Sequence, residues 1–214
     1  MRRVLIALLG LMLAAGIAPV TSEPANGQAW HFHRTEHFTF IYRLEHREAV
    51  DELVSFAEEV YGQVTGYFQT YPDHIPTVVY GEGDLANGYY TSAPPQHIGL
   101  YVSQPTMPRL DVRAESWLRL LFVHEVTHFV HANHGPGFFD FLGTLFGRTI
   151  TGLSLALTPA WAAEGIAINT ETDFTTGGRG RNPLFEMQYK APIVENEMWR
   201  LWQNGYDSYR SPPG

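Results

Sequence analysis

Apolar and polar residues alternate along 37–43, HFTFIYR, which is the pattern of a strand with one buried face. From about 46 to 69 the apolar residues instead recur every three or four positions, so this segment is predicted to be a long amphipathic helix. Two short apolar runs, IPTVVYGE at 75–82 and HIGLYVS at 97–103, predict strands, and GDLANG between them predicts a turn. The first half of the chain is therefore expected to run strand, helix, strand, strand.

Helical spacing dominates the second half of the chain. The segment AESWLRLLFVHEVTHFVHANHG, residues 114–135, predicts a largely buried helix that ends at Gly135. A second helix is expected at 159–169, where Pro159 suits the first turn, and a last one at 184–203. Strands followed by helices favour an α+β fold.

Two segments invite a second interpretation. The apolar stretch 141–158 has Arg148 as its only charge, and its pattern fits a loop and short helix packed over the core. An insertion that touches a membrane or a partner protein is the alternative. The strand at 97–103 would pair with an extended peptide if it lay at a sheet edge.

The N-terminus has the features of an export signal. Arg2 and Arg3 precede an apolar core at 4–18, which is about the length that a signal peptide uses. We expect a signal peptide at 1–29, with an uncleaved anchor as the alternative, and one domain at 30–214. The protein is then exported to the periplasm or the cell exterior, and it contacts the membrane only through this N-terminal segment.

Composition narrows the classes of partner and of metal ligand. The 214 residues are 44% hydrophobic and 17% charged, as in a globular protein, and the net charge of -8 comes without a basic cluster that would bind nucleic acid. There are no cysteines, so a metal must be held by His, Asp or Glu. Of the ten histidines, His31, His33 and His37 are expected in an exposed mature N-terminus.

His124, Glu125 and His128 form the pattern His-Glu-x-x-His in the predicted central helix. Residues four apart on a helix lie on one face, so both imidazoles can converge on one metal ion. Zinc suits such ligands, and a catalytic zinc takes three protein ligands and a water that the intervening glutamate can reach. Hydrogen-bonded histidines of the core are the alternative.

His134 and Glu164 compete for the place of third ligand. His134 matches the spacing of metzincin proteases, but it lies ten residues from His124, which is about 15 Å along a continuous helix. Metzincins turn the chain back with a glycine, and this chain has His131 there. Glu164 lies in AWAAEGIAIN, a segment with almost no polar face, where a carboxylate needs a cation. The geometry favours Glu164, and ligation through His134 stays as the lesser alternative.

The segment HEVTH followed by PAWAAEGIA resembles the gluzincin metallopeptidases, and more specifically the exported bacterial peptidase-MA-like proteins. In that family the peptidase domain often precedes a TolB/WD40-like β-propeller. The segments ANGYYTSAPPQHIGLYV, LFGR and GRGRNPLFEM extend the resemblance over roughly residues 35–205. It implies a zincin-like domain in which a small mixed sheet precedes the two metal-binding helices. It also implies zinc held by His124, His128 and Glu164, with Glu125 as the catalytic base.

The chain departs from gluzincins at one position. Thermolysin-like enzymes carry an aspartate four residues after the glutamate ligand, which orients a ligand histidine, but this chain has Ile168 there. The orienting group must come from elsewhere. By analogy with gluzincins, Tyr189 is our candidate for the donor to the oxyanion. Arg179 and Arg181 are expected in a solvated loop rather than on a substrate carboxylate.

Together these features predict an exported zinc-dependent peptidase that hydrolyses peptide bonds in a peptide or protein substrate. Glu125 would act as general base toward the zinc-activated water. The alternative is a catalytically weak or inactive gluzincin-like module that serves binding or assembly in the cell envelope. An envelope protein or a β-propeller domain is a candidate partner.

Overall fold

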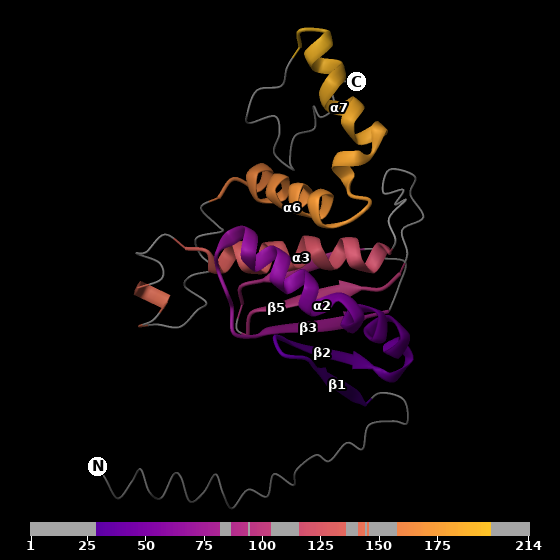
Figure 1. Cartoon of the computed structure of the whole chain (residues 1–214), viewed down its shortest axis with the longest axis vertical. Helices are drawn as coiled ribbons and strands as arrows, with labels where there is room; N and C mark the ends of the chain where they lie inside the picture. Colours follow the sequence, from indigo (N-terminus) through magenta and orange to yellow (C-terminus); the bar gives the residue numbers. More distant parts are fainter. Residues whose placement is uncertain are drawn as a thin grey trace, which may run out of the picture.

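The computed structural model describes residues 29–81, 87–93, 95–103, 116–135, 141–143, 145 and 158–197. Residues 1–28 of the predicted signal peptide at 1–29 lie outside this part of the chain. Most of the apolar stretch 141–158 does so too, and its role stays a prediction. The fold is mixed α+β, built on a five-stranded sheet (Figure 1).

The five strands form one mixed sheet in the order β1-β2-β3-β5-β4. Their bounds are β1 Trp30–Arg34, β2 Phe38–Arg43, β3 Ile75–Tyr80, β4 Gly88–Thr91 and β5 His97–Tyr101. β3 pairs parallel with β2 and with β5, whereas β1 and β4 pair antiparallel at the two edges. The strands predicted at 37–43, 75–82 and 97–103 are confirmed, each with slightly shorter bounds.

The two edge strands, β1 and β4, are additions to the elements expected from sequence. His31 and His33, expected in an exposed tail, lie in β1, where His31 pairs with Tyr42 and His33 with Phe40. β4 has four residues that are all half-buried, so no alternation of apolar and polar residues marks it. β5 lies between β3 and β4, so β4 is the edge strand on that side of the sheet among the described residues.

The helix predicted at 46–69 is confirmed as α2 (Arg47–Phe68), which connects the parallel strands β2 and β3. Its buried residues recur at helical spacing, namely Val50, Leu53, Phe56, Ala57, Val60, Tyr61, Val64 and Thr65. The apolar residues of this stripe belong to the main hydrophobic core, together with residues of the sheet and of α3.

α3 (Trp117–Asn133) and α6 (Ala160–Phe174) confirm the helices predicted at 114–135 and 159–169, and α6 continues further than expected. The backbone N–H of Arg119 donates to the Ser116 side chain, which caps the start of α3. α7 (Pro183–Val194) begins as predicted but ends before residue 203. None of the described helices combines the length and apolarity needed to cross a membrane.

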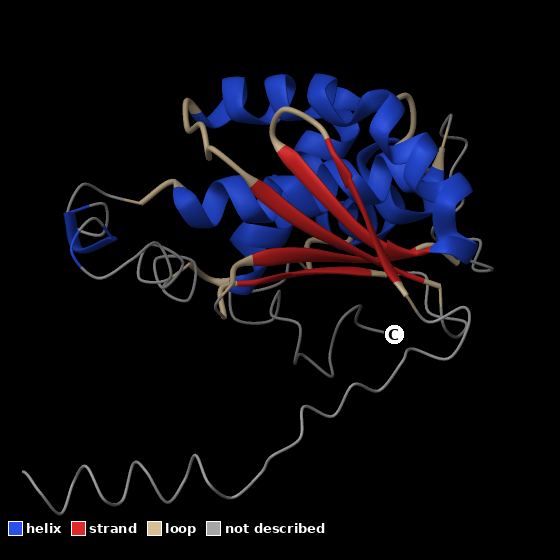
Figure 2. Cartoon of the chain, turned by 90° about the horizontal axis from the view of Figure 1, so that it is seen from below, coloured by secondary structure: helices blue, strands red, loops and turns tan. Residues whose placement is uncertain are grey.

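The core lies between the sheet and the helices that cover one of its faces (Figure 2). Phe122 of α3 is fully buried at its centre. Its ring centroid lies 5.1 Å from that of Phe38 and 6.0 Å from those of Phe40 and Phe56. α3 is therefore anchored to both the sheet and α2 directly beside the His-Glu-x-x-His motif.

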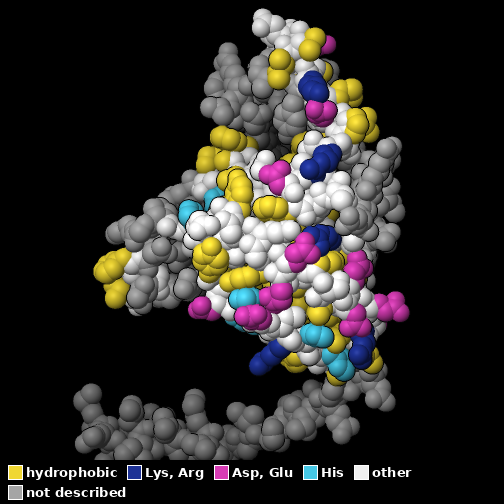
Figure 3. Space-filling model, in the orientation of Figure 1, with side chains coloured by type: hydrophobic (Ala, Val, Ile, Leu, Met, Phe, Trp, Pro, Cys, Tyr) yellow, Lys and Arg dark blue, Asp and Glu magenta, His cyan; other side chains and the backbone are white. Residues whose placement is uncertain are grey.

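Charge is spread over the molecular surface. On the face seen in Figure 3 the Lys and Arg side chains are scattered, so the described residues form no basic patch there of the kind that binds nucleic acid. Apolar side chains are exposed on α7, at the top of this view; they are Leu184, Met187, Ile193 and Val194.

We expect Phe122→Ala to lower the free energy of unfolding by about 3–5 kcal/mol, because it leaves a cavity among three aromatic rings. Urea denaturation measures this as a lower midpoint with an unchanged m-value. Phe32→Ala is the matched control: Phe32 is 64% exposed, and its loss should change stability by less than about 0.5 kcal/mol. A Phe122→Ala variant as stable as this control would contradict the packing described.

Candidate metal centre

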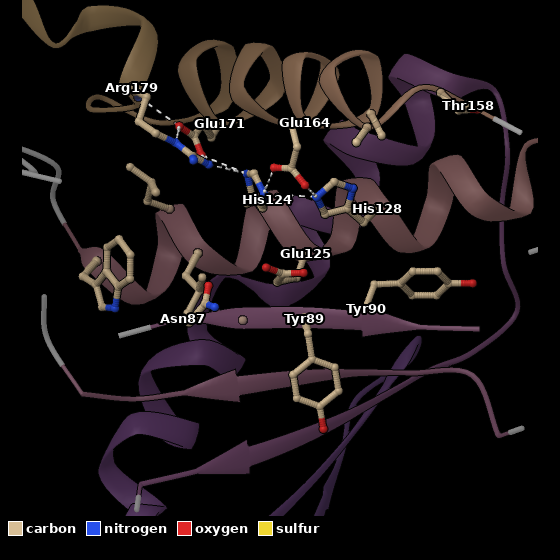
Figure 4. A pocket seen from close by; sticks show the side chains of 16 residues that line it. Asn87, Tyr89, Tyr90, His124, Glu125, His128, Thr158, Glu164, Glu171 and Arg179 are labelled. Atoms are coloured by element: carbon tan, nitrogen blue, oxygen red, sulfur yellow. Dashed lines mark hydrogen bonds and ion pairs between the residues drawn. The ribbon is translucent and has the colours of Figure 1, made fainter. Parts of the chain in front are cut away.

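α3 carries both histidines of the motif on its face toward α6, and Glu125 next to them toward β4 (Figure 4). His124, Glu125 and His128 are buried, with exposed fractions of 7%, 3% and 9%. Most of α3 is buried because it packs against α2, α6, β4 and β5. Polar groups in such a position need partners, since burial removes their contacts with water.

α6 supplies a carboxylate to both histidines. Glu164 Oε2 lies 3.4 Å from His124 Nε2, and Glu164 Oε1 lies 3.5 Å from His128 Nε2. The two Nε2 atoms are 3.1 Å apart. A hydrogen bond of 2.7 Å between the hydroxyls of Thr127 and Thr170, both fully buried, joins α3 to α6 nearby. Helix packing thus brings together three residues that the sequence separates by 40 positions.

These three side chains fit a metal ion. Their donor atoms, two imidazole nitrogens and a carboxylate oxygen, all lie within 4.8 Å of one another. A tetrahedral ion with bonds of 2.0–2.1 Å holds its ligand atoms about 3.3 Å apart, close to the separations found between these residues. The structure therefore groups His124, His128 and Glu164 closely enough to bind one ion, and it supports the choice of Glu164 as the third ligand.

Glu171 of α6 contacts the other nitrogen of His124, and its role was not identified from the sequence. Its Oε2 atom lies 3.1 Å from His124 Nδ1, and the side chain is fully buried. A hydrogen on Nδ1 that is donated to this carboxylate leaves Nε2 free to bind metal. Glu171 follows Glu164 by seven residues, which is about two helical turns, so both face α3. It supplies the orienting carboxylate that Ile168 cannot.

Arg179 holds Glu171 in place. Its backbone N–H donates to Glu171 Oε1 at 2.9 Å, its Nε donates to the same oxygen at 2.8 Å, and Nη2 donates to Oε2 at 2.9 Å. Nη2 also lies 2.8 Å from His124 Nδ1. Since a nitrogen that bears hydrogen cannot accept, we assign this guanidinium to the carboxylate rather than to the ring. The expectation that Arg179 lies in a solvated loop is wrong.

The turn after α6 needs glycine to bring Arg179 back to the site. Gly178 has a positive φ of 89°, and a Cβ atom there would lie 2.7 Å from the Cα atom of Thr172. Arg181, also expected in a solvated loop, donates from Nη1 to the backbone carbonyls of Thr175 and Gly177 at 3.0 Å. Arg181 thereby stabilises the C-terminal end of α6, where backbone carbonyls lack partners within the helix.

The electrostatics of the metal-free cluster favour a positive charge. Burial works to lower the pKa of His124, but hydrogen bonds to Glu164 and Glu171 prevail and raise it to about 9. Burial and the charge of His124 lower the pKa of His128 to about 4. Burial works to raise the pKa of Glu171, but hydrogen bonds with His124 and Arg179 lower it to about 2. A metal ion at the two Nε2 atoms would take the place of the extra proton that gives this pair of rings its positive charge.

Glu125 differs from the other carboxylates of the site. Its Oε2 atom is buried and has no hydrogen-bond partner among the described residues. Burial raises its pKa to about 7. Figure 4 shows it below the two histidines, on the side of α3 that faces β4. A buried carboxylate without a hydrogen-bonding partner on this oxygen is free to exchange a proton with a molecule in the cleft.

The cluster opens into a cleft of about 590 Å³. β4 and the preceding Asn87 form one wall, α6 forms the opposite wall, and α3 forms the floor (Figure 4). The lining includes both histidines, Glu125, Glu164, Glu171 and Arg179, together with apolar residues such as Trp117, Leu120 and Leu121. The cluster is thus accessible to a ligand.

Two other sequence candidates lie elsewhere or remain open. His134 follows the last residue of α3, and its Nδ1 atom lies 2.6 Å from the hydroxyl of Thr70, so it is not part of the cluster. Tyr189 lies in α7, but its side chain is outside the described part of the structure, so its role as oxyanion donor stays a prediction.

A second group of close acidic and histidine residues is explained by ordinary hydrogen bonding. Glu36, His37 and Glu58 lie near one another. Glu58 accepts hydrogen bonds from the Thr35 hydroxyl at 2.5 Å and from the His37 backbone N–H at 3.0 Å, and its Oε2 atom lies 2.6 Å from His37 Nδ1. Burial works to raise the pKa of Glu58, but these bonds lower it below its usual value. The group ties β2 to α2.

Comparisons with models of protein families, with curated proteins and with solved structures found no match. The resemblance to gluzincins therefore rests on the sequence motifs alone and stays an expectation.

We expect Glu171→Ala to weaken metal binding by about 10–100-fold, because His124 loses the carboxylate that orients its ring. Glu171→Gln should lose less, since its amide oxygen still accepts from Nδ1. Competition between the protein and a chromogenic chelator for Zn²⁺ measures the affinity. Glu186→Gln, on the exposed part of α7, is the control. Wild-type affinity in Glu171→Ala would show that the contact with His124 has no role in metal binding.

Proposed function

We propose that this protein is a zinc-dependent peptidase of the gluzincin type. The observation that carries the proposal is the position of Glu125, a buried carboxylate that lines the same cleft as the cluster of His124, His128 and Glu164. A site that only stored a metal or used it structurally would have no need of a further buried carboxylate with an unpartnered oxygen beside the three ligand residues.

Zinc is the ion that we propose for the cluster. Two imidazole nitrogens and one carboxylate oxygen, from His124, His128 and Glu164, are the ligand set of many hydrolytic zinc sites, and the chain offers no thiolate. When bound in such a site, zinc polarises a carbonyl and makes a water molecule more acidic. Glu171 and Arg179 keep the His124 ring oriented for its ligand role.

Glu125 is proposed as the general base. A carboxylate whose pKa is raised to about 7 takes up and gives up a proton at neutral pH with little energetic penalty in either direction. Glu125 would accept a proton from the water that attacks the peptide carbonyl, and would then donate it to the nitrogen of the leaving amine. The other carboxylates are less suited to this role, because His124 lowers the pKa of Glu164 and the bonds to His124 and Arg179 lower that of Glu171.

A peptide or protein is the substrate that best suits the cleft. β4 forms one wall, and it pairs with β5 on one side only. An extended peptide can add to such a free edge through main-chain hydrogen bonds. The segment 97–103, expected from sequence to offer this edge, cannot do so because β5 is paired on both sides. We propose that β4 takes its place.

The binding or assembly module of the envelope is the weaker hypothesis. Two features of the sequence favour it, the apolar segment 141–158 and the missing carboxylate at Ile168. The first lies mostly outside the described residues. For the second, Glu171 supplies the orienting carboxylate instead. We also propose export of the protein, on the basis of its N-terminal sequence alone.

We expect Glu125→Gln to bind zinc as tightly as the wild type but to lower kcat/KM for peptide cleavage by about 10²–10⁴-fold, because the amide cannot accept a proton. A broad peptide library with mass-spectrometric detection identifies a substrate, and a metal chelator should abolish cleavage until zinc is restored. Glu186→Gln is again the exposed control.

Two outcomes would contradict the proposal. Unchanged cleavage by Glu125→Gln would remove Glu125 as the base. Zinc-loaded wild-type protein that cleaves no member of the library would favour the binding module.

A further inference from the structure

We propose that Gly88 of β4 is a positioning residue for the reaction: the absence of a side chain there provides the space in which Glu125 lies beside the metal cluster. The inference rests on the proposed role of Glu125 as the base. It concerns the wall of the cleft rather than the ligands, and its steric content is independent of the identity of the ion.

The contact between the two residues is direct. A Cβ atom on Gly88 would lie 2.6 Å from Cγ, 2.7 Å from Oε1 and 2.8 Å from Cδ of Glu125, whereas Cβ atoms in proteins essentially never approach other atoms within 3.0 Å. Three atoms of one side chain would be displaced at once. Glu125 is 3% exposed and lines the cleft, so a displaced side chain would move into the cleft and away from its present place beside the cluster.

The alignment of β4 along α3 places residue 88 next to Glu125. Tyr90 packs edge-to-face on Phe129, with ring centroids 5.6 Å apart. Two residues along a strand span about 6.8 Å, and four residues along a helix span about 6 Å, so the step from Tyr90 to Gly88 matches the step from Phe129 to Glu125. The aromatic pair therefore sets the glycine opposite the carboxylate.

The backbone of β4 cannot simply retreat to make room. Gly88 pairs with Leu100 of β5, and the backbone N–H of Tyr101 donates to the carbonyl of Asn87 at 2.9 Å. β5 is in turn paired with β3 inside the sheet. A side chain at position 88 would therefore displace Glu125 more readily than the strand.

Other glycines of the chain show that this contact is particular to position 88. Gly99, on the neighbouring strand, would meet the ring of Tyr89 instead, at 2.2 Å. Gly66 in α2 has no atom within 4 Å of its hypothetical Cβ. Gly88 begins β4, and among these glycines only its hypothetical Cβ would meet Glu125.

The first experiment compares Gly88→Ala with Gly66→Ala in the zinc-loaded protein. We expect Gly88→Ala to lower kcat by about 100-fold, as a shift of about 1 Å in a catalytic group does, while KM and the affinity for zinc stay near wild type. Gly66→Ala should leave all three unchanged. If the wild type cleaves peptide and Gly88→Ala has the same kcat, the proposed function stands but this inference is overturned.

The second experiment needs no activity and tests the contact in metal-free protein. Gly88→Ala should lower the Tm by about 2–10 °C when Glu125 is present, and by less than about 1 °C in a Glu125→Ala background, where the clashing atoms are gone. An equal loss of Tm in both backgrounds would overturn the inference, and so would a double variant that fails to fold. If the wild type cleaves no peptide, the proposed function fails, and this cycle still decides whether residue 88 sets the position of Glu125.

Discussion

The burial of ionisable side chains on α3 is the constraint on which the rest of the site depends. His124, Glu125 and His128 lie in a helix that is packed against α2, the edge of the sheet and α6. Removing such groups from water is unfavourable unless protein groups or an ion replace the lost contacts. α6 provides the replacement, with Glu164 facing both Nε2 atoms and Glu171 facing Nδ1 of His124. The polar site is therefore complete only when α6 packs on α3.

Charge balance extends this dependence to a metal ion. Three carboxylates line the cleft, those of Glu125, Glu164 and Glu171, and the guanidinium of Arg179 is engaged by Glu171. In the metal-free chain the remaining negative charge is met by a proton on His124, whose pKa is raised to about 9. A bound divalent cation would meet it more fully, and it would need α6 in place, because Glu164 lies on α6. Metal binding is thus expected to stabilise the contact between α3 and α6.

The sequence predicts the parts of the fold that depend on local periodicity. α2, α3 and α6 and the three inner strands follow from the spacing of apolar residues. The three residues of the candidate metal cluster follow from spacing along a helix and from the near absence of other polar positions around Glu164. β1 and β4 are not predicted from periodicity, because a short edge strand owes its conformation to a partner strand that the local sequence does not reveal. The role of Glu171 is not predicted for a related reason. In the sequence, a carboxylate two turns beyond Glu164 is indistinguishable from a solvated residue, and only the turn at Gly178 brings Arg179 into contact with it.

The site arises where three structural periods coincide. Four residues along α3 bring His124 and His128 to one face, where they could hold one ion, and seven residues along α6 bring Glu164 and Glu171 to the same side of that pair. Two residues along β4 separate the position that carries Tyr90 from the position that carries no side chain. The spacing along β4 affects the site on α3 through Glu125. This residue lies one position beyond His124, so it points from α3 toward β4 rather than toward α6 (Figure 4). In our proposal, the strand that best suits an incoming peptide is therefore also the element that confines Glu125, and a change in its register would alter both at once.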